Sequence, residues 1–214
     1  MITDNFFSKS FFETWLKQAH PKIKDWFQKE IDYLKNNIKP NSKILDIGCG
    51  FGRHIELIAD FSKEVIGIDN NKDMVQKAKD RLSNFKNVKI LLQDAQNLKF
   101  QDDYFDYVIC MTNTFGDFPD IKLNVLKEMK RVCKKGGKII ISVYNDKALE
   151  IRKKDYKKVG LHIIKIKDGI VYTKEGLISE QFTKQQLKEL FDKLKLKSKI
   201  LELNPISFLC ELQK

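Results

Sequence analysis

The sequence predicts an α/β fold, in which helices cover both faces of a mostly parallel, seven-stranded sheet. Two observations carry this prediction. Short apolar strands alternate with helical segments through the middle of the chain, a pattern typical of βαβ units. One of these strands, residues 43–47, runs directly into Gly48, Gly50 and Gly52. A glycine turn of this kind lets a ligand approach the N-terminus of the next helix, as in the nucleotide sites of open α/β sheets.

Length and composition indicate one ordered domain. A chain of 214 residues that is 42% hydrophobic can bury a single large core. No apolar run approaches the roughly 18 residues of a membrane span, and the N-terminus lacks the basic start and cleavage site of a secretory signal. We therefore expect a cytoplasmic protein without membrane contact. The four cysteines form no C-x-x-C pair, so neither a zinc site nor a compact disulfide framework is expected.

The net charge of +11 would suit a nucleic-acid partner. Only four of the 40 basic residues are arginine, however, and arginine is the residue favoured for bidentate contacts with phosphate. The lysines are spread over nearly every predicted helix, which favours a solvated lysine-rich surface. An RNA partner stays open as an alternative and is not favoured.

The first 40 residues are expected to form a helical cap. Phe7, Phe11 and Trp15 lie at i, i+4 and i+8, on one face of a first helix. Pro21 ends that helix and suits the first turn of a second helix over residues 22–37. The apolar stripe of the second helix is made by Ile23, Trp26, Phe27, Ile31, Leu34 and Ile38.

Two acidic residues follow the next strands of the predicted sheet. The strand over residues 64–69 ends in Asp69, which comes 19 residues after Gly50. A βαβ unit offers a carboxylate to the hydroxyls of a ribose at this place. The alternative for Asp69 is capping of the helix over residues 72–83. Asp94 follows the third strand in the same way, and a turn-forming role is its alternative.

The glycine turn itself indicates which nucleotide to expect. A dinucleotide fingerprint reads G-x-G-x-x-G, but its third glycine position holds Arg53. The run from Asp46 to Gly52 reads D-x-G-x-G-x-G instead. In this run, and in the Lys-x-Gly-Gly sequence before the fifth strand, the chain resembles the class I S-adenosylmethionine-dependent methyltransferases. The resemblance implies a Rossmann-like sheet of strand order 3-2-1-4-5-7-6 with strand seven antiparallel; a lone NAD-binding domain is the weaker alternative.

The resemblance also implies S-adenosylmethionine as the cofactor. Asp46 and the glycines would hold the amino-acid end of the cofactor, Asp69 its ribose, and Asp94 with the backbone N–H of Ala95 its adenine. The expected cofactor-binding residues are Asp46, Gly48, Cys49, Gly50, Asp69, Asn70, Asp94, Ala95 and Met111.

Residues 112–118 follow the fourth strand and should lie where cofactor meets acceptor, because ligands bind at the carboxyl ends of the strands. This segment lacks the N/D-P-P-aromatic motif of adenine-N6 methyltransferases. Cys110 lacks the adjacent proline of cysteine-dependent RNA enzymes. The run Asn113-Thr114-Phe115-Gly116 is similar to a segment of the glycine and sarcosine N-methyltransferases. The expected catalytic residues are Asn113 and Tyr144, and the expected substrate contacts are Phe11, Trp15, Asn113 and Phe115.

The C-terminal part of the chain should supply a second cap and complete the sheet. A turn at 134–137 is expected before a strand over 138–144. The hairpin signal Asp168-Gly169 predicts a small antiparallel cap inserted over the pocket, and Thr183 should cap the helix that follows. The expected parts are 1–40 as N-terminal helical cap, 41–144 as cofactor-binding core, 145–182 as cap insertion and 183–214 as C-terminal helix and strands.

These features predict methyl transfer to a small-molecule acceptor, with an amine as one acceptor class. Because a sulfonium is a good leaving group, the protein must mainly align the reacting atoms and exclude water. A catalytic base is optional, no metal is expected, and the three histidines are expected to be structural or on the surface. The alternatives are a methyltransferase that acts on RNA or protein, and a cofactor-binding module without catalysis.

Overall fold

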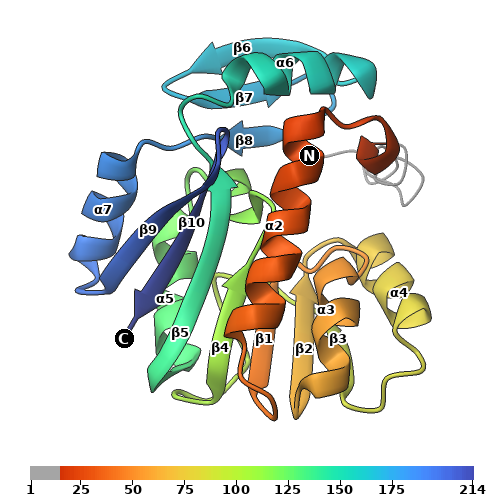
Figure 1. The fold of residues 1–214 in the computed structure, drawn as a ribbon, viewed down its shortest axis with the longest axis vertical. Helices are drawn as coiled ribbons and strands as arrows, with labels where there is room; N and C mark the ends of the chain where they lie inside the picture. Colours follow the sequence, from red (N-terminus) through yellow and green to blue (C-terminus); the bar gives the residue numbers. More distant parts are fainter. Residues whose placement is uncertain (1–14) are drawn as a thin grey trace.

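The computed structural model describes residues 15–214, and its centre is a seven-stranded sheet of order β3-β2-β1-β4-β5-β10-β9 (Figure 1). Strand β10 runs antiparallel to both of its neighbours, whereas β1 to β5 pair in parallel. The predicted order, with one reversed strand between two others, is therefore confirmed. The strands are β1 (Lys43–Ile47), β2 (Glu64–Asp69), β3 (Val88–Leu92), β4 (Phe105–Cys110), β5 (Cys133–Tyr144), β9 (Lys197–Asn204) and β10 (Ser207–Gln213).

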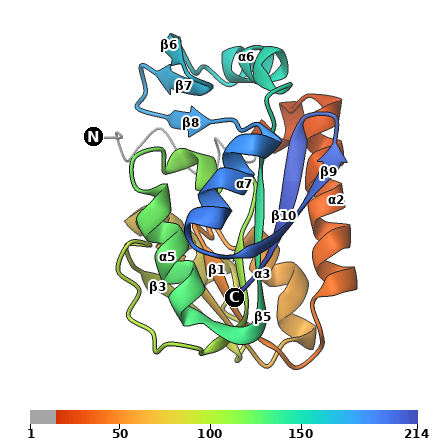
Figure 2. The same cartoon turned by 90° about the vertical axis from the view of Figure 1, so that its left-hand side faces the viewer.

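Helices cover both faces of this sheet, as predicted (Figure 2). Apolar residues of α5 and α7 pack against one face, and apolar residues of α2, α3 and α4 pack against the other. Two separate cores result, because a buried parallel strand presents apolar side chains to both faces. The helices are α2 (Pro21–Asn37), α3 (Arg53–Ile58), α4 (Lys72–Arg81), α5 (Lys122–Val132) and α7 (Lys184–Lys193), with short 3₁₀ turns at Ala59–Phe61 and Thr114–Asp117.

Local sequence signals set several helix starts. Pro21 opens α2, as predicted, and the His20 side chain accepts a hydrogen bond from the Lys22 N–H. Thr183 caps α7 through a capping box with Gln186, which satisfies two backbone donors reciprocally. These starts depend on residues within one turn, which explains why the sequence pattern located them.

The run Lys134–Gly137 differs from its prediction. It was expected as a turn after a helix, but the chain passes straight from α5 into β5, which already begins at Cys133. Gly136 has φ +77°, and the register between β4 and β5 shifts near this point. Glycine allows such an irregularity inside a strand, so the Lys-x-Gly-Gly sequence marks a bulge rather than a turn.

The insertion between β5 and α7 stands over the carboxyl ends of the sheet strands (Figure 1). The predicted hairpin at Asp168-Gly169 is present and joins β6 to β7. The helix α6 and a third strand, β8, were not foreseen, because α6 buries mainly polar residues, Arg152, Asp155 and Tyr156. The elements of the insertion are α6 (Leu149–Lys158), β6 (Ile163–Lys167), β7 (Ile170–Thr173) and β8 (Ile178–Glu180).

The N-terminal segment contacts the insertion. The Trp15 ring packs edge-on against Phe27 at a centroid distance of 5.3 Å. Asp155 of α6 accepts hydrogen bonds from the Trp15 indole N–H at 3.2 Å and from the His20 backbone N–H at 2.9 Å. The two segments that were expected to cap the pocket therefore meet at Asp155. Phe11, an expected substrate contact, lies outside the described residues.

Candidate functional site

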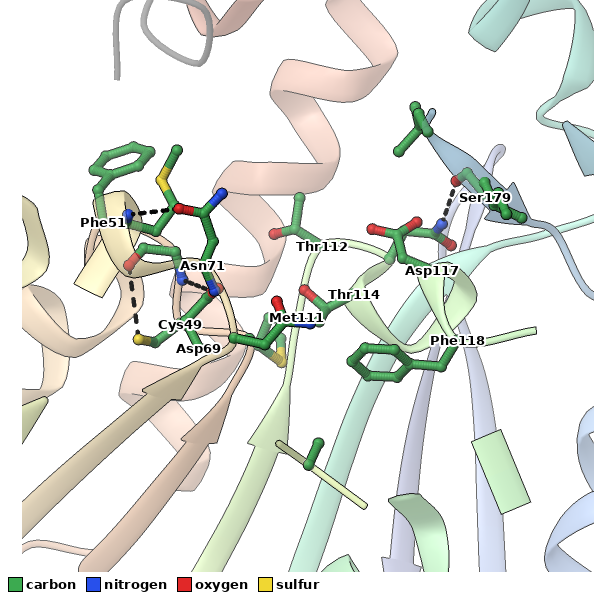
Figure 3. A pocket seen from close by; sticks show the side chains of 18 of the residues that line it. Cys49, Phe51, Asp69, Asn71, Met111, Thr112, Thr114, Asp117, Phe118 and Ser179 are labelled. Carbon is green, nitrogen blue, oxygen red and sulfur yellow. Dashed lines mark hydrogen bonds between the residues drawn. The ribbon is translucent and has the colours of Figure 1, made fainter. Parts of the chain in front are cut away.

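A cavity of about 790 Å³ lies at the carboxyl ends of the central strands, beneath the insertion. One end is formed by the glycine turn after β1 and by the ends of β2 and β3. The other end is formed by the segment after β4, the end of β5 and apolar side chains of the insertion. Figure 3 shows both ends, with Cys49 and Asp69 on one side, Asp117 and Ser179 on the other, and Met111 and Thr112 between them.

The glycine turn needs its glycines for different reasons. Gly48 and Gly50 both have positive φ, +67° and +53°, where a side chain costs roughly 1–2 kcal/mol. A Cβ on Gly48 would also overlap the Thr114 side chain. A Cβ on Gly50 would meet nothing within 4 Å, because this residue borders the cavity. The backbone of Gly50 is therefore open to close approach by a ligand.

Asp69 joins the glycine turn to the loop after β2. Its Oδ2 accepts a hydrogen bond from the Gly50 N–H at 2.9 Å, and its Oδ1 accepts one from the Asn71 N–H at 2.9 Å. Burial raises the pKa of Asp69, and these backbone hydrogen bonds oppose the rise. Asp69 does not cap α4, which was the alternative role considered for it, because the N-cap of this helix is Asn71. Each Asp69 oxygen keeps further acceptor capacity toward the cavity.

Asp46 is buried in β1 beside the turn, with 1% of its surface exposed. Its Oδ2 has no hydrogen-bond partner among the described residues. Burial, and secondarily the charge of Asp69, raise the pKa of Asp46 well above its usual value. A buried acceptor without a partner is costly, so a cationic or hydrogen-bonding group at this end of the cavity would stabilise it.

All nine residues expected to bind the cofactor line this single cavity: Asp46, Gly48, Cys49, Gly50, Asp69, Asn70, Asp94, Ala95 and Met111. They come from the ends of four strands and reach one place because β1, β2, β3 and β4 are neighbours in the sheet. The Asp94 side chain also accepts a hydrogen bond from the Gln96 N–H at 2.8 Å, so its turn-forming role is present alongside its place in the lining.

Only some of the residues expected at the acceptor end line the cavity. Trp15, Tyr144 and Asn113 line the cavity. Phe115 does not: its ring is fully buried and packs against Phe182 in the core below, at a centroid distance of 6.2 Å. The expected substrate contact of Phe115 is therefore corrected. The 3₁₀ turn that begins at Thr114 directs this side chain toward the core between the sheet and α5.

The side chain of Asn113 is occupied by two contacts that fix its surroundings. Its Nδ2 donates to the Ser179 Oγ at 2.9 Å, and its Oδ1 accepts from the Tyr144 N–H at 2.9 Å. These bonds tie the segment after β4 to β5 and to the insertion. Both polar atoms of the Asn113 side chain are therefore engaged within the protein, and its catalytic role stays a prediction.

Tyr144 has an aromatic and cationic environment. Its ring packs edge-on against Trp26 at 4.7 Å, and the Arg152 guanidinium lies 4.8 Å from the ring centre. Burial raises the pKa of the Tyr144 phenol well above its usual value. The neutral phenol is therefore a hydrogen-bonding group in the cavity wall at ordinary pH.

Sequence reasoning missed a buried network centred on Glu30. This residue of α2 is fully buried, and its two carboxylate oxygens accept hydrogen bonds from the Thr112 N–H at 2.9 Å and the Thr112 hydroxyl at 2.7 Å. His54 Nε2 lies 3.3 Å from Glu30 Oε2, and Arg53 Nη2 lies 3.7 Å from it. The available signal was a glutamate at position 30, at i+3 and i+4 from Phe27 and Trp26 on the buried face of the helix.

Glu30 supports a backbone segment that is unfavourable on its own. Thr112 and Asn113 have positive φ values of 51° and 64°, a conformation that costs of order 1–3 kcal/mol for each non-glycine residue. Burial raises the pKa of Glu30, but His54 and Arg53 outweigh burial and hold it below the usual value. Burial lowers the pKa of His54. The neutral imidazole thus has a structural place, in agreement with the expectation for the histidines.

Arg53 is the second residue that was missed as part of the site. It lines the cavity beside the glycine turn, and its guanidinium lies 4.6 Å from the Phe27 ring centre. Its Nη2 also donates to the Thr112 hydroxyl at 3.0 Å. The residue that disqualified the dinucleotide fingerprint therefore places a cation near Asp46, at the same end of the cavity.

Asp117 is the third site residue that the sequence analysis missed, and it lies at the acceptor end (Figure 3). Burial raises its pKa to about 7 from an ordinary 3.8, although interactions with Ser179, Arg152 and Asn113 lower it.

In the part of the chain that the structure describes, no cluster of His, Cys, Asp and Glu side chains could hold a metal ion. No helix between residues 15 and 214 has the length and apolarity needed to cross a membrane.

Comparison with known sequences gives the family. A methyltransferase domain family model matches residues 38–195. A demethylmenaquinone methyltransferase of Staphylococcus saprophyticus is 32% identical over 169 residues, which cover 73% of this chain and 70% of that protein. A protein of the same name from Staphylococcus aureus is 35% identical over 124 residues, covering 56% of this chain and half of that protein.

Solved structures agree on the fold. The PH0226 protein of Pyrococcus horikoshii superposes with a TM-score of 0.71 at 28% identity, covering 87% of this chain and 90% of that one. An S-adenosylmethionine-dependent methyltransferase of Clostridium acetobutylicum gives a TM-score of 0.70 at 16% identity, covering 96% and 98%. With the matching family model, the related sequences and the shared strand order, this chain belongs to the class I S-adenosylmethionine-dependent methyltransferases.

Proposed function

We propose that this enzyme transfers the methyl group of S-adenosylmethionine to a small, largely apolar acceptor held beneath the insertion. The observation that carries the proposal is that one cavity joins the glycine turn to an apolar chamber. The insertion supplies the chamber with Tyr156, Val159, Leu161, Leu177 and Ile178. A relative that acts on a small molecule, the demethylmenaquinone methyltransferase of Staphylococcus saprophyticus, supports this acceptor class.

The charges at the glycine end suit the cofactor. The unpartnered oxygen of Asp46 would accept from the ammonium of its amino-acid end, and Arg53 would pair with the carboxylate. Asp69 would accept from the ribose hydroxyls, because a carboxylate can meet both oxygens of a vicinal diol. Asp94 and the Ala95 N–H would contact the adenine. When bound, the cofactor supplies an activated methyl group and a thioether leaving group.

The remaining work of the protein is alignment and exclusion of water. Hydrogen bonds hold the segment after β4 in place: Thr112 donates to Glu30, and Asn113 contacts Ser179 and Tyr144. These bonds position the floor between the two ends of the cavity. Apolar side chains of the insertion and of α2 would exclude water from the acceptor. Alignment of this kind can account for a large share of a rate enhancement.

The ribose assignment can be tested by binding alone. Calorimetry would compare 5′-methylthioadenosine with its 2′-deoxy analogue, in the wild type and in Asp69→Asn. We expect loss of the 2′-hydroxyl to weaken binding about tenfold in the wild type and to have little effect in the variant. Asp73→Asn, which changes an exposed acid in the first turn of α4, is the matched control. Failure of S-adenosylmethionine to bind the wild type would remove the proposed function itself.

An RNA acceptor is the alternative that the net charge of +11 brings in. Such a partner would bind with an affinity that falls steeply with salt concentration. The insertion and the N-terminal segment both close over the cavity, which favours a small molecule. If RNA bound with a steep salt dependence and inhibited turnover of the cofactor, an RNA acceptor would be favoured over a small molecule. An amine acceptor, which the segment of residues 113–116 suggested, stays within the proposal.

A further inference from the structure

Asp117 is an ionisable group in a chamber that is otherwise apolar and aromatic. It ends the 3₁₀ turn after β4 and lines the cavity on the side away from Asp69 (Figure 3). Its side chain is accessible even though protein surrounds it. Asp117 can be both accessible and surrounded by protein because it lines the cavity. Asp117 is therefore placed to contact whatever occupies the chamber.

The contacts around Asp117 do not neutralise its charge. Asn113 and Ser179 face it, and Asn113 donates to the Ser179 Oγ at 2.9 Å, which leaves the Ser179 hydroxyl proton for the carboxylate. The cation that lowers the pKa of Asp117 is Arg152, whose nitrogens donate instead to the Gln181 Oε1 at 3.0 Å and the Ser179 carbonyl oxygen at 2.6 Å. No ion pair joins Asp117 to another of the described residues.

A carboxylate with only a structural role would be expected to have a partner, as the neighbouring Glu180 does. Glu180 is buried and forms an ion pair with Lys122. Other titratable groups that interact electrostatically with Asp117 are Tyr144 on β5 and Cys110 on β4. Burial raises the pKa of both well above the ordinary values, so both are neutral. A carboxylate without an ion-pair partner beside an apolar chamber costs stability, and an O–H or N–H of a ligand would offset part of this cost.

We propose that Asp117 is the catalytic base of this enzyme, and that its acceptor is a planar, apolar compound carrying an ionisable O–H or N–H. The inference rests on the proposed methyl transfer. The acceptor oxygen or nitrogen uses a lone pair to bond the methyl carbon. The bond between that carbon and sulfur breaks, its electron pair stays on sulfur, and the acceptor proton passes to an Asp117 oxygen. The carboxylic acid then returns the proton to water.

The titration behaviour of Asp117 fits this role. Its pKa of about 7 matches that of a base that must be ionised before the reaction and protonated after it. A fully exposed aspartate would be a much weaker proton acceptor. A charged arginine or lysine at this position could not accept the proton at all.

Two naphthalenes test the assignment by binding, followed through their own fluorescence. 2-Naphthol carries an O–H, and 2-methoxynaphthalene has the same ring system without one. We expect Asp117→Asn to weaken 2-naphthol about tenfold and to leave 2-methoxynaphthalene and S-adenosylmethionine unaffected. Asp120→Asn removes an exposed acid outside the cavity and should change none of the three affinities. In the wild type, the preference for 2-naphthol should rise as the pH increases through about 7.

The same pair tests the proton transfer, because methylation of 2-naphthol yields 2-methoxynaphthalene. With S-adenosylmethionine present, we expect this product from the wild type and at least about a hundredfold less from Asp117→Asn. Equal binding of the two naphthalenes, or binding of neither, overturns the acceptor class. Binding of 2-naphthol without product overturns the role as base.

Two further outcomes keep the assignments separable. If Asp117→Asn does not fold, the wild type decides alone, and a naphthol preference that does not change through about pH 7 overturns the inference. If S-adenosylmethionine does not bind the wild type, the proposed function fails, while the pH-dependent preference for 2-naphthol still reports on Asp117 as the carboxylate of the chamber.

Discussion

The two ends of the cavity are built on different principles. The glycine end consists of backbone and short acidic side chains at the ends of adjacent parallel strands, and Asp69 holds two backbone N–H groups there. The acceptor end consists of side chains from the N-terminal segment, the segment after β4, β5 and the insertion. These are joined by bonds such as that between Asn113 and Ser179, which are 66 residues apart.

Because of this difference, one fold can keep its cofactor site while its acceptor site changes. The glycine end depends on φ angles and on strand order, so few substitutions are compatible with it. The acceptor end depends on apolar side chains in an insertion, where substitution changes the chamber without disturbing the sheet. Five substitutions test this contrast, beginning with the one that should have the largest effect.

Glu30→Gln tests the network that joins the two ends. Removal of the charge leaves Arg53 and His54 without their anionic partner and weakens the hydrogen bonds that Thr112 donates. We expect a loss of about 3–5 kcal/mol in the free energy of unfolding. Urea denaturation measures it. Asp32→Asn, an exposed acid on the same helix, should stay within about 0.5 kcal/mol of the wild type. A loss that small for Glu30→Gln would show that the network does not support the fold.

The same network predicts a pH dependence. The pKa values of Glu30 and His54 are lowered in the folded state from 4.5 and 6.5. Groups with lowered pKa values stabilise the folded state above their unfolded values and lose that contribution as the pH falls. The wild type should therefore lose stability below about pH 6.5, where His54 takes up a proton, and again below about pH 4.5, where Glu30 does. Glu30→Gln should lack the second of these losses. Parallel curves for the two proteins would contradict this account.

Gly48→Ala and Gly50→Ala separate backbone strain from occupied space. Gly48→Ala combines strain at φ +67° with overlap against Thr114, so we expect a loss of about 2–3 kcal/mol in stability. Gly50→Ala meets no protein atom within 4 Å and should lose about 1 kcal/mol. Its methyl group would project into the cavity and weaken S-adenosylmethionine in calorimetry. Full cofactor affinity in Gly50→Ala would place the cofactor elsewhere.

Asp117→Asn should stabilise the protein at alkaline pH. The folded-state pKa of about 7 lies above the ordinary 3.8, so the wild type loses stability as the pH rises from the lower value through the higher one. The amide has no such titration. Thermal unfolding should show Asp117→Asn gaining on the wild type between about pH 5 and about pH 8. A constant difference across this range would mean that Asp117 is solvated like a surface aspartate.

Tyr172→Ala probes the chamber alone and carries the smallest expected effect. Tyr172 lies on β7 and lines the cavity, so its loss should weaken 2-naphthol about fivefold, or about 1 kcal/mol. The affinity for S-adenosylmethionine should not change. Ile166→Ala, on the neighbouring strand but outside the cavity lining, is the control for the insertion. A change in cofactor affinity would show that the two ends are coupled.

The fold and the glycine end of the cavity could be predicted from the sequence. Strand periodicity, the D-x-G-x-G-x-G run and the spacing to Asp69 are local signals, and parallel strands bring their carboxyl ends together wherever the sheet forms. This is why nine separate predictions converged on one cavity. Helix starts at Pro21 and Thr183 were predictable for the same reason.

The acceptor end could not be predicted in this way, because it depends on contacts between distant segments. Glu30 meets Thr112 across 82 residues, Phe115 turned into the core, and Asp117 became exceptional only because an insertion closed above it. Charge, burial and strain at these positions depend on which segments pack together, and no local pattern specifies that packing. The sequence alone does not distinguish a carboxyl group on the surface from one that borders an apolar chamber, although these surroundings set its pKa and its chemistry.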